Sequence, residues 1–186
     1  KEMQYLNISN NDIGDEGIEA LLPALTNHSS LQTLSICGNP SITTRGWQSL
    51  AAIFETPNSD LRELEIQRNN VDDEAAAAFA NTLVNNHTLH TMYMDGNPSI
   101  TAEGWHAFSN VLCNTSSVNA TFLSNHTLHY LGHKVPENAI IRPFLLLNER
   151  DDEKEVAVIK ILQTHEDFDM LPFFEWEFKV LPLALR

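Results

Sequence analysis

The sequence predicts an α/β solenoid of about five strand-helix repeats, with a parallel sheet on its concave side and a helical cap at its C-terminal end. Two recurring phrases predict this fold. The phrase that begins at Leu31 (LQTLSICGNPSIT) returns at Leu89 (LHTMYMDGNPSIT), and the phrase at Met3 is echoed after the same interval at Leu61. Because the two phrases alternate, a single unit is roughly 30 residues long, a period typical of a solenoid whose neighbouring units bury one another's apolar faces.

Each repeat opens with a short predicted strand. The apolar residues alternate there, as in Leu64 and Ile66 or Met92 and Met94, which is the period of a strand with one buried face. Each strand is followed by an asparagine, and we expect its amide to bond buried backbone groups of neighbouring turns. This structural ladder consists of Asn11, Asn39, Asn69 and Asn97.

The second half of each repeat is predicted to be helical. An apolar stripe with i, i+3, i+4, i+7 spacing begins once in every repeat and at a constant interval, at Ile18, Trp47, Ala76 and Trp105. Both tryptophans are therefore expected in the core. The residue before each stripe is small, which predicts a close approach of helix backbone to the sheet: Gly17, Gly46, Ala75 and Gly104. Helix N-caps are predicted at Thr43, Asp72 and Thr101.

The pattern weakens in the fifth unit. Val118, Leu123 and Leu128 fit the strand and turn positions only with Thr121 in place of an aliphatic residue. The repeat ends before Pro136, a helix is predicted over 152–164, and an aromatic tail follows it. We therefore expect a solenoid over residues 1–132, a fragment without an N-terminal cap, and a mostly helical cap or tail over 133–186.

The composition limits the function classes. The chain has 186 residues, 42% of them hydrophobic, and a net charge of -14. Residues 1–132 hold fourteen carboxylates against Lys1 and three arginines. Such a surface repels phosphate and attracts basic proteins, so we expect no nucleic-acid partner. No apolar run is long enough to cross a membrane, so no membrane insertion is expected.

The repeats resemble the ribonuclease-inhibitor-like class of leucine-rich repeats, which form a horseshoe with helices on the convex side. The resemblance covers residues 3–132 and includes the phrase NDIGDEGIEAL at 11–21. The family includes ribonuclease inhibitors, sensor regions of nucleotide-binding immune receptors, and activators of the Ran GTPase. The resemblance implies macromolecular binding on the concave sheet and its ascending loops, and it does not identify the partner.

Carried onto this chain, the resemblance implies a set of side chains that face a partner from the concave sheet. Glu63 and Glu65 stand beside aromatic residues there, which suits a basic or mixed protein surface because rings carry binding energy and charge sets selectivity. The expected partner-binding residues are Tyr5, Asn7, Ser35, Glu63, Glu65, Gln67, Tyr93, Asp95 and Phe122.

We expect no catalytic residue, no cofactor and no metal site. The string His126, His129, His133 has a spacing that could suit zinc, but two of these histidines belong to the phrase NHTLH, which also occurs at 86–90 inside an ordinary repeat. Cys37 and Cys113 lie far apart and resemble no disulfide cap, which favours a reducing compartment. We expect an intracellular protein, and six N-x-S/T triplets leave the secretory route open: Asn7, Asn27, Asn86, Asn114, Asn119 and Asn125.

Three functions are compatible with these residues. The first is a noncatalytic module that binds a protein partner through the concave face, and the acidic charge favours a basic partner. The alternative is a structural subunit of a larger assembly, held through its open N-terminal edge and its aromatic C-terminal tail. The third is a regulator of an enzyme, similar to a GTPase activator or a ribonuclease inhibitor.

Overall fold

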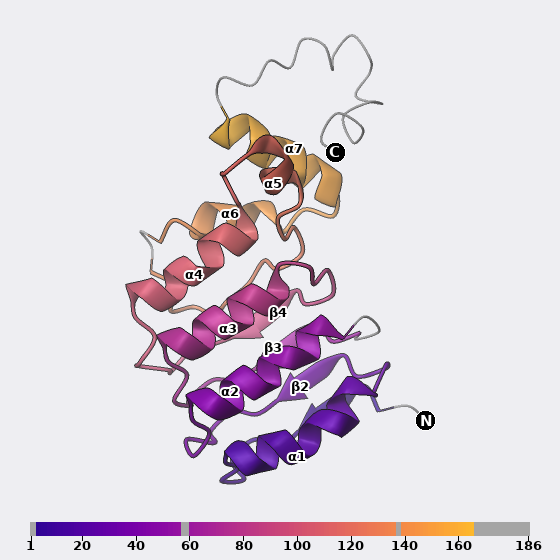
Figure 1. Ribbon diagram of the computed structural model, residues 1–186, viewed down its shortest axis with the longest axis vertical. Helices are drawn as coiled ribbons and strands as arrows, with labels where there is room; N and C mark the ends of the chain where they lie inside the picture. The colour runs from indigo at the N-terminus through magenta and orange to yellow at the C-terminus, as the bar shows by residue number, and fades with distance from the viewer. Residues whose placement is uncertain (1–2, 57–59, 137–138, 166–186) are drawn as a thin grey trace.

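The computed structural model describes residues 3–56, 60–136 and 139–165. Its centre is a four-stranded parallel sheet whose strands lie in chain order. The strands are β1 (Tyr5–Asn7), β2 (Thr33–Ser35), β3 (Glu63–Glu65) and β4 (Thr91–Tyr93). Figure 1 shows the helices of successive repeats stacked in the same order along the long axis of the molecule. The α/β repeat architecture with a parallel sheet is confirmed.

One helical segment follows each strand. These segments are α1 (Asp15–Thr26), α2 (Thr44–Ala51) continued by the 3-10 helix η1 (Ala52–Glu55), α3 (Asp73–Leu83) and α4 (Ala102–Leu112). The middle residue of each strand points toward the helices, and Leu34, Leu64 and Met92 are fully buried. Trp47 is also fully buried and its ring lies 6.4 Å from that of Phe79, so the predicted helical stripe forms the core.

Asparagine amides bond the turns after the strands to one another. The buried Asn69 donates from Nδ2 to the carbonyls of Ile36 and Ile66, each at 3.0 Å, and its Oδ1 accepts from the backbone N–H of Asn39 at 2.6 Å. Asn97 repeats this pattern one unit later, accepting from the N–H groups of Asn69 and Val71. Backbone groups that the turns would leave buried and unpaired are thus satisfied between repeats.

The small residue that precedes each helical stripe is required for a different reason from the one predicted. A methyl group on Gly46 would lie 2.5 Å from Oδ1 of Asp15 and 2.7 Å from Cγ2 of Ile42. The close approach is therefore to the neighbouring helix and to the turn before α2, and not to the sheet. Asp15 occupies this space because it accepts hydrogen bonds from the N–H and hydroxyl of Thr43.

The predicted N-caps differ in how they act. The side chains of Asp72 and Thr101 accept from backbone N–H groups at the starts of α3 and α4. Thr43 stands at the N-cap position of α2 but makes no capping bond, because its hydroxyl donates to Asp15 of the preceding repeat.

The fifth unit departs from the prediction. Residues 118–122 form the helix α5 (Val118–Phe122) and not a strand, with Ser117 capping its start. The sheet is continued instead by a single parallel bridge between Thr91 and Tyr130. The repeat resumes at Leu128, which is fully buried like Leu89, and the intervening α5 makes the interval between these two leucines longer than one ordinary repeat.

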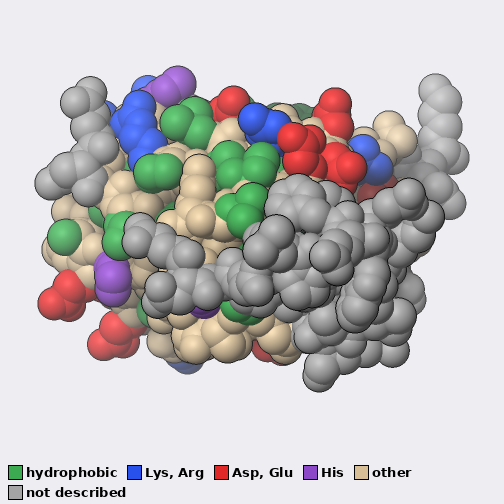
Figure 2. All heavy atoms as spheres, turned by 90° about the horizontal axis from the view of Figure 1, so that it is seen from above, with side chains coloured by type: hydrophobic (Ala, Val, Ile, Leu, Met, Phe, Trp, Pro, Cys, Tyr) green, Lys and Arg blue, Asp and Glu red, His purple; other side chains and the backbone are tan. Residues whose placement is uncertain are grey.

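Two further helices follow the last bridge within residues 139–165. They are α6 (Arg142–Leu147) and α7 (Glu153–Thr164), the second matching the predicted helix over 152–164. α7 packs against α5, with Phe122 and Ile161 in one apolar cluster (Figure 1). Seen from this end of the molecule, the described surface carries hydrophobic side chains beside acidic and basic ones (Figure 2). The aromatic tail that the sequence places after α7 lies outside the described residues.

One charged side chain fixes α7 to the last repeats. Lys160 is fully buried, and its Nζ donates to the carbonyl of Leu112 at 2.6 Å and to that of Asn125 at 3.0 Å, with Nδ1 of His126 at 3.1 Å. Burial lowers the pKa of Lys160 to about 7. Burial also lowers the pKa of His126, to about 4, and the neighbouring Lys160 charge contributes to this decrease.

Candidate functional site

The candidate site is the sheet surface that points away from the helices, called here the strand face. The parallel register aligns its side chains in two rows across the sheet. The first row contains Tyr5, Thr33, Glu63 and Thr91, and the second contains Asn7, Ser35, Glu65 and Tyr93. Because successive side chains of a strand point to opposite sides, these rows are what the sheet presents on the face opposite the core.

The centre of the strand face combines two carboxylates with an aromatic ring. Glu63 and Glu65 of β3 lie in register with Thr91 and Tyr93 of β4, and all four are half-buried. Partial burial raises the pKa of the Tyr93 phenol, and the charges of Glu63 and Glu65 raise it further. The phenol therefore stays protonated as a hydrogen-bond donor in a negatively charged neighbourhood.

The structure adds Tyr130 to this face, a residue that the prediction missed. Its backbone bridges to β4 beside Thr91, and its ring lies 5.1 Å from that of Tyr93 and 5.5 Å from that of His133. The Tyr130 hydroxyl is shielded from solvent and has no hydrogen-bond partner within the described chain. The phrase NHTLH at 125–129 could have revealed it, since its copy at 86–90 leads directly into β4.

Two of the predicted partner-binding residues do not contribute to the exposed surface of the strand face. Phe122 belongs to α5 and packs beside Ile161, because the fifth strand is replaced by that helix. Ser35 lies on the strand face but is only 2% exposed, since its hydroxyl bonds that of Ser9 at 2.8 Å. Phe122 is therefore removed from the face, and Ser35 contributes to its packing and not to its exposed surface.

The remaining predicted residues are brought together by the sheet. Tyr5 at the edge of β1 is 53% exposed, and Asn7 donates to its hydroxyl at 3.0 Å. Gln67 and Asp95 come just after β3 and β4. The Cys37 thiol donates to Oε1 of Gln67 at 2.8 Å, and Asp95 accepts from the backbone N–H of Lys134 at 2.9 Å.

A groove of about 530 Å³ lies where the strands end, and it is called here the rim groove. It continues the strand face, because Tyr93 and Gln67 line both. Its lining is completed by loop residues after the strands and by the segment after the last bridge: Asn10, Cys37, Gly38, Arg68, Asp95, Gly96, His133 and Lys134.

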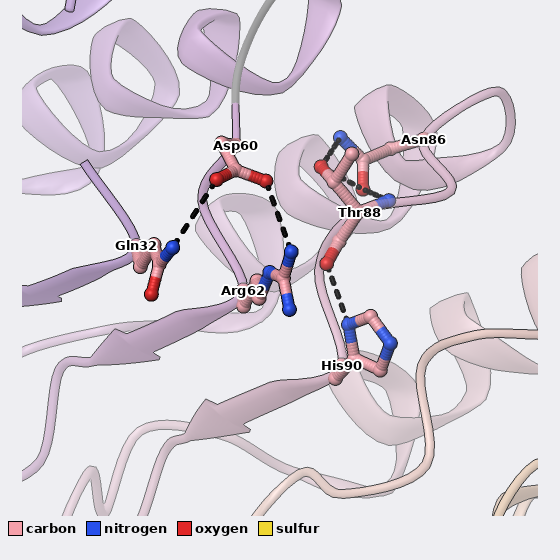
Figure 3. Close-up of polar contacts among 6 residues, drawn as sticks. All are labelled: Gln32, Asp60, Arg62, Asn86, Thr88 and His90. Atoms are coloured by element: carbon pink, nitrogen blue, oxygen red, sulfur yellow. Dashed lines mark hydrogen bonds and ion pairs between the residues drawn. The ribbon is translucent and has the colours of Figure 1, made fainter. Parts of the chain in front are cut away.

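The opposite margin of the sheet, before the strands, is closed by internal polar contacts (Figure 3). Asp60 accepts from Nε2 of Gln32 at 3.3 Å and pairs with the guanidinium of Arg62 at 3.4 Å. Nδ1 of His90 lies 2.6 Å from the carbonyl of Thr88. Each of the six side chains drawn in Figure 3 makes at least one polar contact within the chain, so this margin is less suited to a ligand than the rim groove.

The three histidines of the zinc-like string point to different partners. His126 is buried against Lys160, His129 lies against His90, and His133 makes an edge-to-face contact with Tyr130. Within the described ranges, no group of three or more His, Cys, Asp or Glu side chains is placed to hold a metal ion. Both cysteines are free thiols, with Cys113 buried. None of the helices in the described part of the chain has the length and apolarity that crossing a bilayer requires.

Two of the N-x-S/T triplets are part of the folded core. Asn125 is fully buried and its Nδ2 donates to the carbonyls of Leu83 and Asn86 at 2.9 and 2.7 Å. Asn86 is 6% exposed, and its Oδ1 accepts from the N–H groups of Thr88 and Leu89. The predicted turn geometry explains both asparagines, and neither amide is accessible in the folded chain.

Comparison with known proteins identifies the repeat. A family model described as "Leucine Rich repeat" matches residues 3–22 and 58–80. Human "NACHT, LRR and PYD domains-containing protein 13" is 29% identical over 126 residues, which are 67% of this chain and 12% of that protein. Mouse "NACHT, LRR and PYD domains-containing protein 4C" is 40% identical over 76 residues, 39% of this chain and 7% of that protein. The chain thus spans only a small part of the length of these relatives.

Two solved structures share the fold. The actin-binding site 2 of leiomodin-1 superimposes with a TM-score of 0.61 at 16% identity, covering 89% of this chain and 87% of that one. The C-terminal domain of tropomodulin from Caenorhabditis elegans gives a TM-score of 0.60 at 16% identity, with coverages of 90% and 91%. At this identity the likeness concerns the fold, and the ribonuclease-inhibitor-like class stays a prediction.

Proposed function

Because the chain belongs to the leucine-rich-repeat family, we propose that it is a noncatalytic module that binds a protein through the strand face, the side expected to be concave. The carrying observation is the cluster of half-buried Glu63 and Glu65 on β3 and Tyr93 on the adjacent β4, where the register pairs Tyr93 with Glu65. Polar and aromatic side chains at this density on a sheet face are suited to contacts with another macromolecule.

The charge of the face indicates what kind of protein it fits. Glu63 and Glu65 have no cationic partner within 4 Å in the described part of the chain, so their charges are available to a ligand. A basic surface would complement them, and the net charge of -14 would speed its approach. Tyr93 and Tyr130 would supply the aromatic contact area.

The comparisons support binding as a class of function. The leiomodin-1 structure that shares this fold is an actin-binding site, which is compatible with a role of this chain in protein recognition. With 16% identity, actin itself is not carried over to this chain. The structural-subunit alternative depends partly on the aromatic tail, which lies outside the described residues, and the exposed edge residue Tyr5 is what supports it.

Charge reversal of the strand face tests the proposal. The double substitution E63K/E65K is expected to abolish capture of the natural partner from native extract, while the melting temperature changes little because both side chains are only half-buried. The matched control is E74K/E103K, an equal change in net charge on α3 and α4 at exposed positions. Capture that survives E63K/E65K, or that is lost equally with the control, would contradict the proposal.

A further inference from the structure

Of the three arginines in the solenoid, Arg68 differs from the other two in its ion pairs. Arg45 pairs with Asp15 and Glu19, and Arg62 pairs with Asp60. Arg68 makes no ion pair with any residue in the described ranges. Arg142 also lacks an ion pair in the described residues, but it donates to the carbonyl of Val135 at 3.5 Å, so Arg68 is the described arginine whose guanidinium has neither kind of partner.

The backbone holds Arg68 at the rim groove. The residue has a φ of 57°, in the left-handed region that costs a side chain other than glycine roughly 1 to 2 kcal/mol. The equivalent positions in the repeats on either side are glycines, Gly38 and Gly96, with φ values of 64° and 76°. The Arg68 side chain lies close to Gly96, because a methyl group added to Gly96 would lie 3.2 Å from Cγ of Arg68.

A second set of basic groups reaches the same groove from the other side. His133 and Lys134 follow the last strand bridge and are exposed. Asp95 is the one carboxylate among the residues that line the groove, and it already accepts from the backbone N–H of Lys134 at 2.9 Å. The groove therefore presents two fixed positive charges and an imidazole around one carboxylate that already has a partner.

One hydroxyl without a partner lies behind these charges. The Tyr130 hydroxyl is shielded and has no hydrogen-bond partner in the described chain, and its ring makes edge-to-face contacts with Tyr93 and His133, which both line the groove. A carboxylate in the groove can accept from the guanidinium of Arg68 and the ammonium of Lys134 at once, and such charge-assisted bonds are about twice as strong as neutral ones.

We propose that the rim groove binds an acidic segment of the same partner whose basic surface lies on Glu63 and Glu65. This inference depends on the proposed function and makes it more specific: the partner carries opposite charges side by side, basic residues over β3 and carboxylates over Arg68 and Lys134. Each half alone would bind weakly, and joining them makes the second contact intramolecular. A uniformly basic or uniformly acidic protein would be rejected at one of the two positions.

Three short synthetic peptides test this on the isotope-labelled chain by amide chemical shifts: oligoglutamate, oligolysine, and an oligolysine block joined to an oligoglutamate block. At about 0.15 M salt, charges farther apart than roughly 8 Å are screened, so the shifts report local contacts. Oligoglutamate is expected to shift the amides of Gly96 and Lys134, and oligolysine those of Glu63 and Glu65. The joined peptide is expected to bind about tenfold more tightly than oligolysine.

Two variants separate the halves. R68Q/K134Q is expected to abolish the oligoglutamate shifts and to lower the affinity of the joined peptide to that of oligolysine. The matched control is R62Q, since Arg62 lies before β3 and is paired with Asp60. The proposal is overturned if oligoglutamate leaves Gly96 and Lys134 unshifted, or if R62Q weakens its binding as much as R68Q/K134Q. Loss of the oligolysine shifts alone would instead count against the strand face.

Discussion

Replacing Asn69 by alanine leaves the backbone N–H of Asn39 without a partner, whereas the carbonyls of Ile36 and Ile66 also accept from Nδ2 of the neighbouring ladder asparagines. The side chain is 3% exposed and satisfies two carbonyls and one N–H, those of Ile36, Ile66 and Asn39. Each backbone group left buried without a partner costs about 1 to 3 kcal/mol. Because one such group is left unpaired, we expect N69A to lower the free energy of unfolding by about 1 to 3 kcal/mol.

The neighbouring asparagine supplies the control. Asn70 is exposed and makes one hydrogen bond, from Nδ2 to the carbonyl of Pro40 at 2.6 Å. N70A removes the same atoms from a position open to water, so we expect a change of about 0.5 kcal/mol or less. Urea unfolding followed by circular dichroism measures both. Similar losses in the two variants, or an N69A loss below about 1 kcal/mol, would refute the ladder argument.

Three further predictions follow from buried contacts. The pKa of Lys160 is about 7 in the folded chain and 10.5 in the unfolded chain, so the unfolded state binds more protons between these values and stability rises with pH there. Relative to K160M, the free energy of unfolding of the wild type should rise by about 1.4 kcal/mol per pH unit above about pH 7.5. The same dependence on pH in both proteins would rule this out. For His126 the folded pKa is about 4 and the unfolded value 6.5, so stability should fall as pH drops from 6.5 towards 4. In thermal unfolding measured at a series of pH values, the melting temperature of H126Q should decrease less than that of the wild type between pH 6.5 and 4. An equal decrease in both would contradict the low pKa of His126 in the folded chain. G46A should cost about 1 to 3 kcal/mol, because the methyl group would overlap Asp15 and Ile42, and an unchanged melting temperature would show that the neighbours yield freely.

The repeat could be predicted from the sequence because it depends on contacts that recur at fixed intervals. Alternating residues such as Leu64 and Ile66 and helical stripes such as that at Trp47 report the buried side of each element directly, and both are buried as expected. Helix α7 was also predicted closely, because Asp152 caps a regular apolar pattern with bonds to the N–H groups of Lys154 and Glu155.

The end of the repeat could not be predicted in the same way. Residues 118–122, which the sequence assigns to the strand and turn of the fifth unit, form a helix, because Ser117 caps it and Thr121 bonds back to the carbonyls of Asn114 and Ser117. Lys160 sits on an apolar face of α7, and its acceptors come from residues 112, 125 and 126. A local pattern in the sequence does not report partners that only the folded chain brings together.

The rim groove illustrates the same limit for the candidate site. The family resemblance implies Glu63 and Glu65 as partner-binding residues, and they lie on the strand face. The grouping of Arg68 with Lys134, which is far away along the chain, depends on how far α5 displaces the last bridge. That displacement also brought Tyr130 onto the strand face and took Phe122 away from it.

The buried amide of Asn125 limits the biosynthetic routes along which this chain can fold correctly. Its Nδ2 atom is the one that carries an oligosaccharide when such a triplet is modified, and in the folded chain that atom is occupied by two carbonyl oxygens. An oligosaccharide attached to the nascent chain at Asn125 would keep the turn that begins there from packing against the turn at residues 83–86. Biosynthesis along a route that glycosylates this triplet would therefore yield misfolded material.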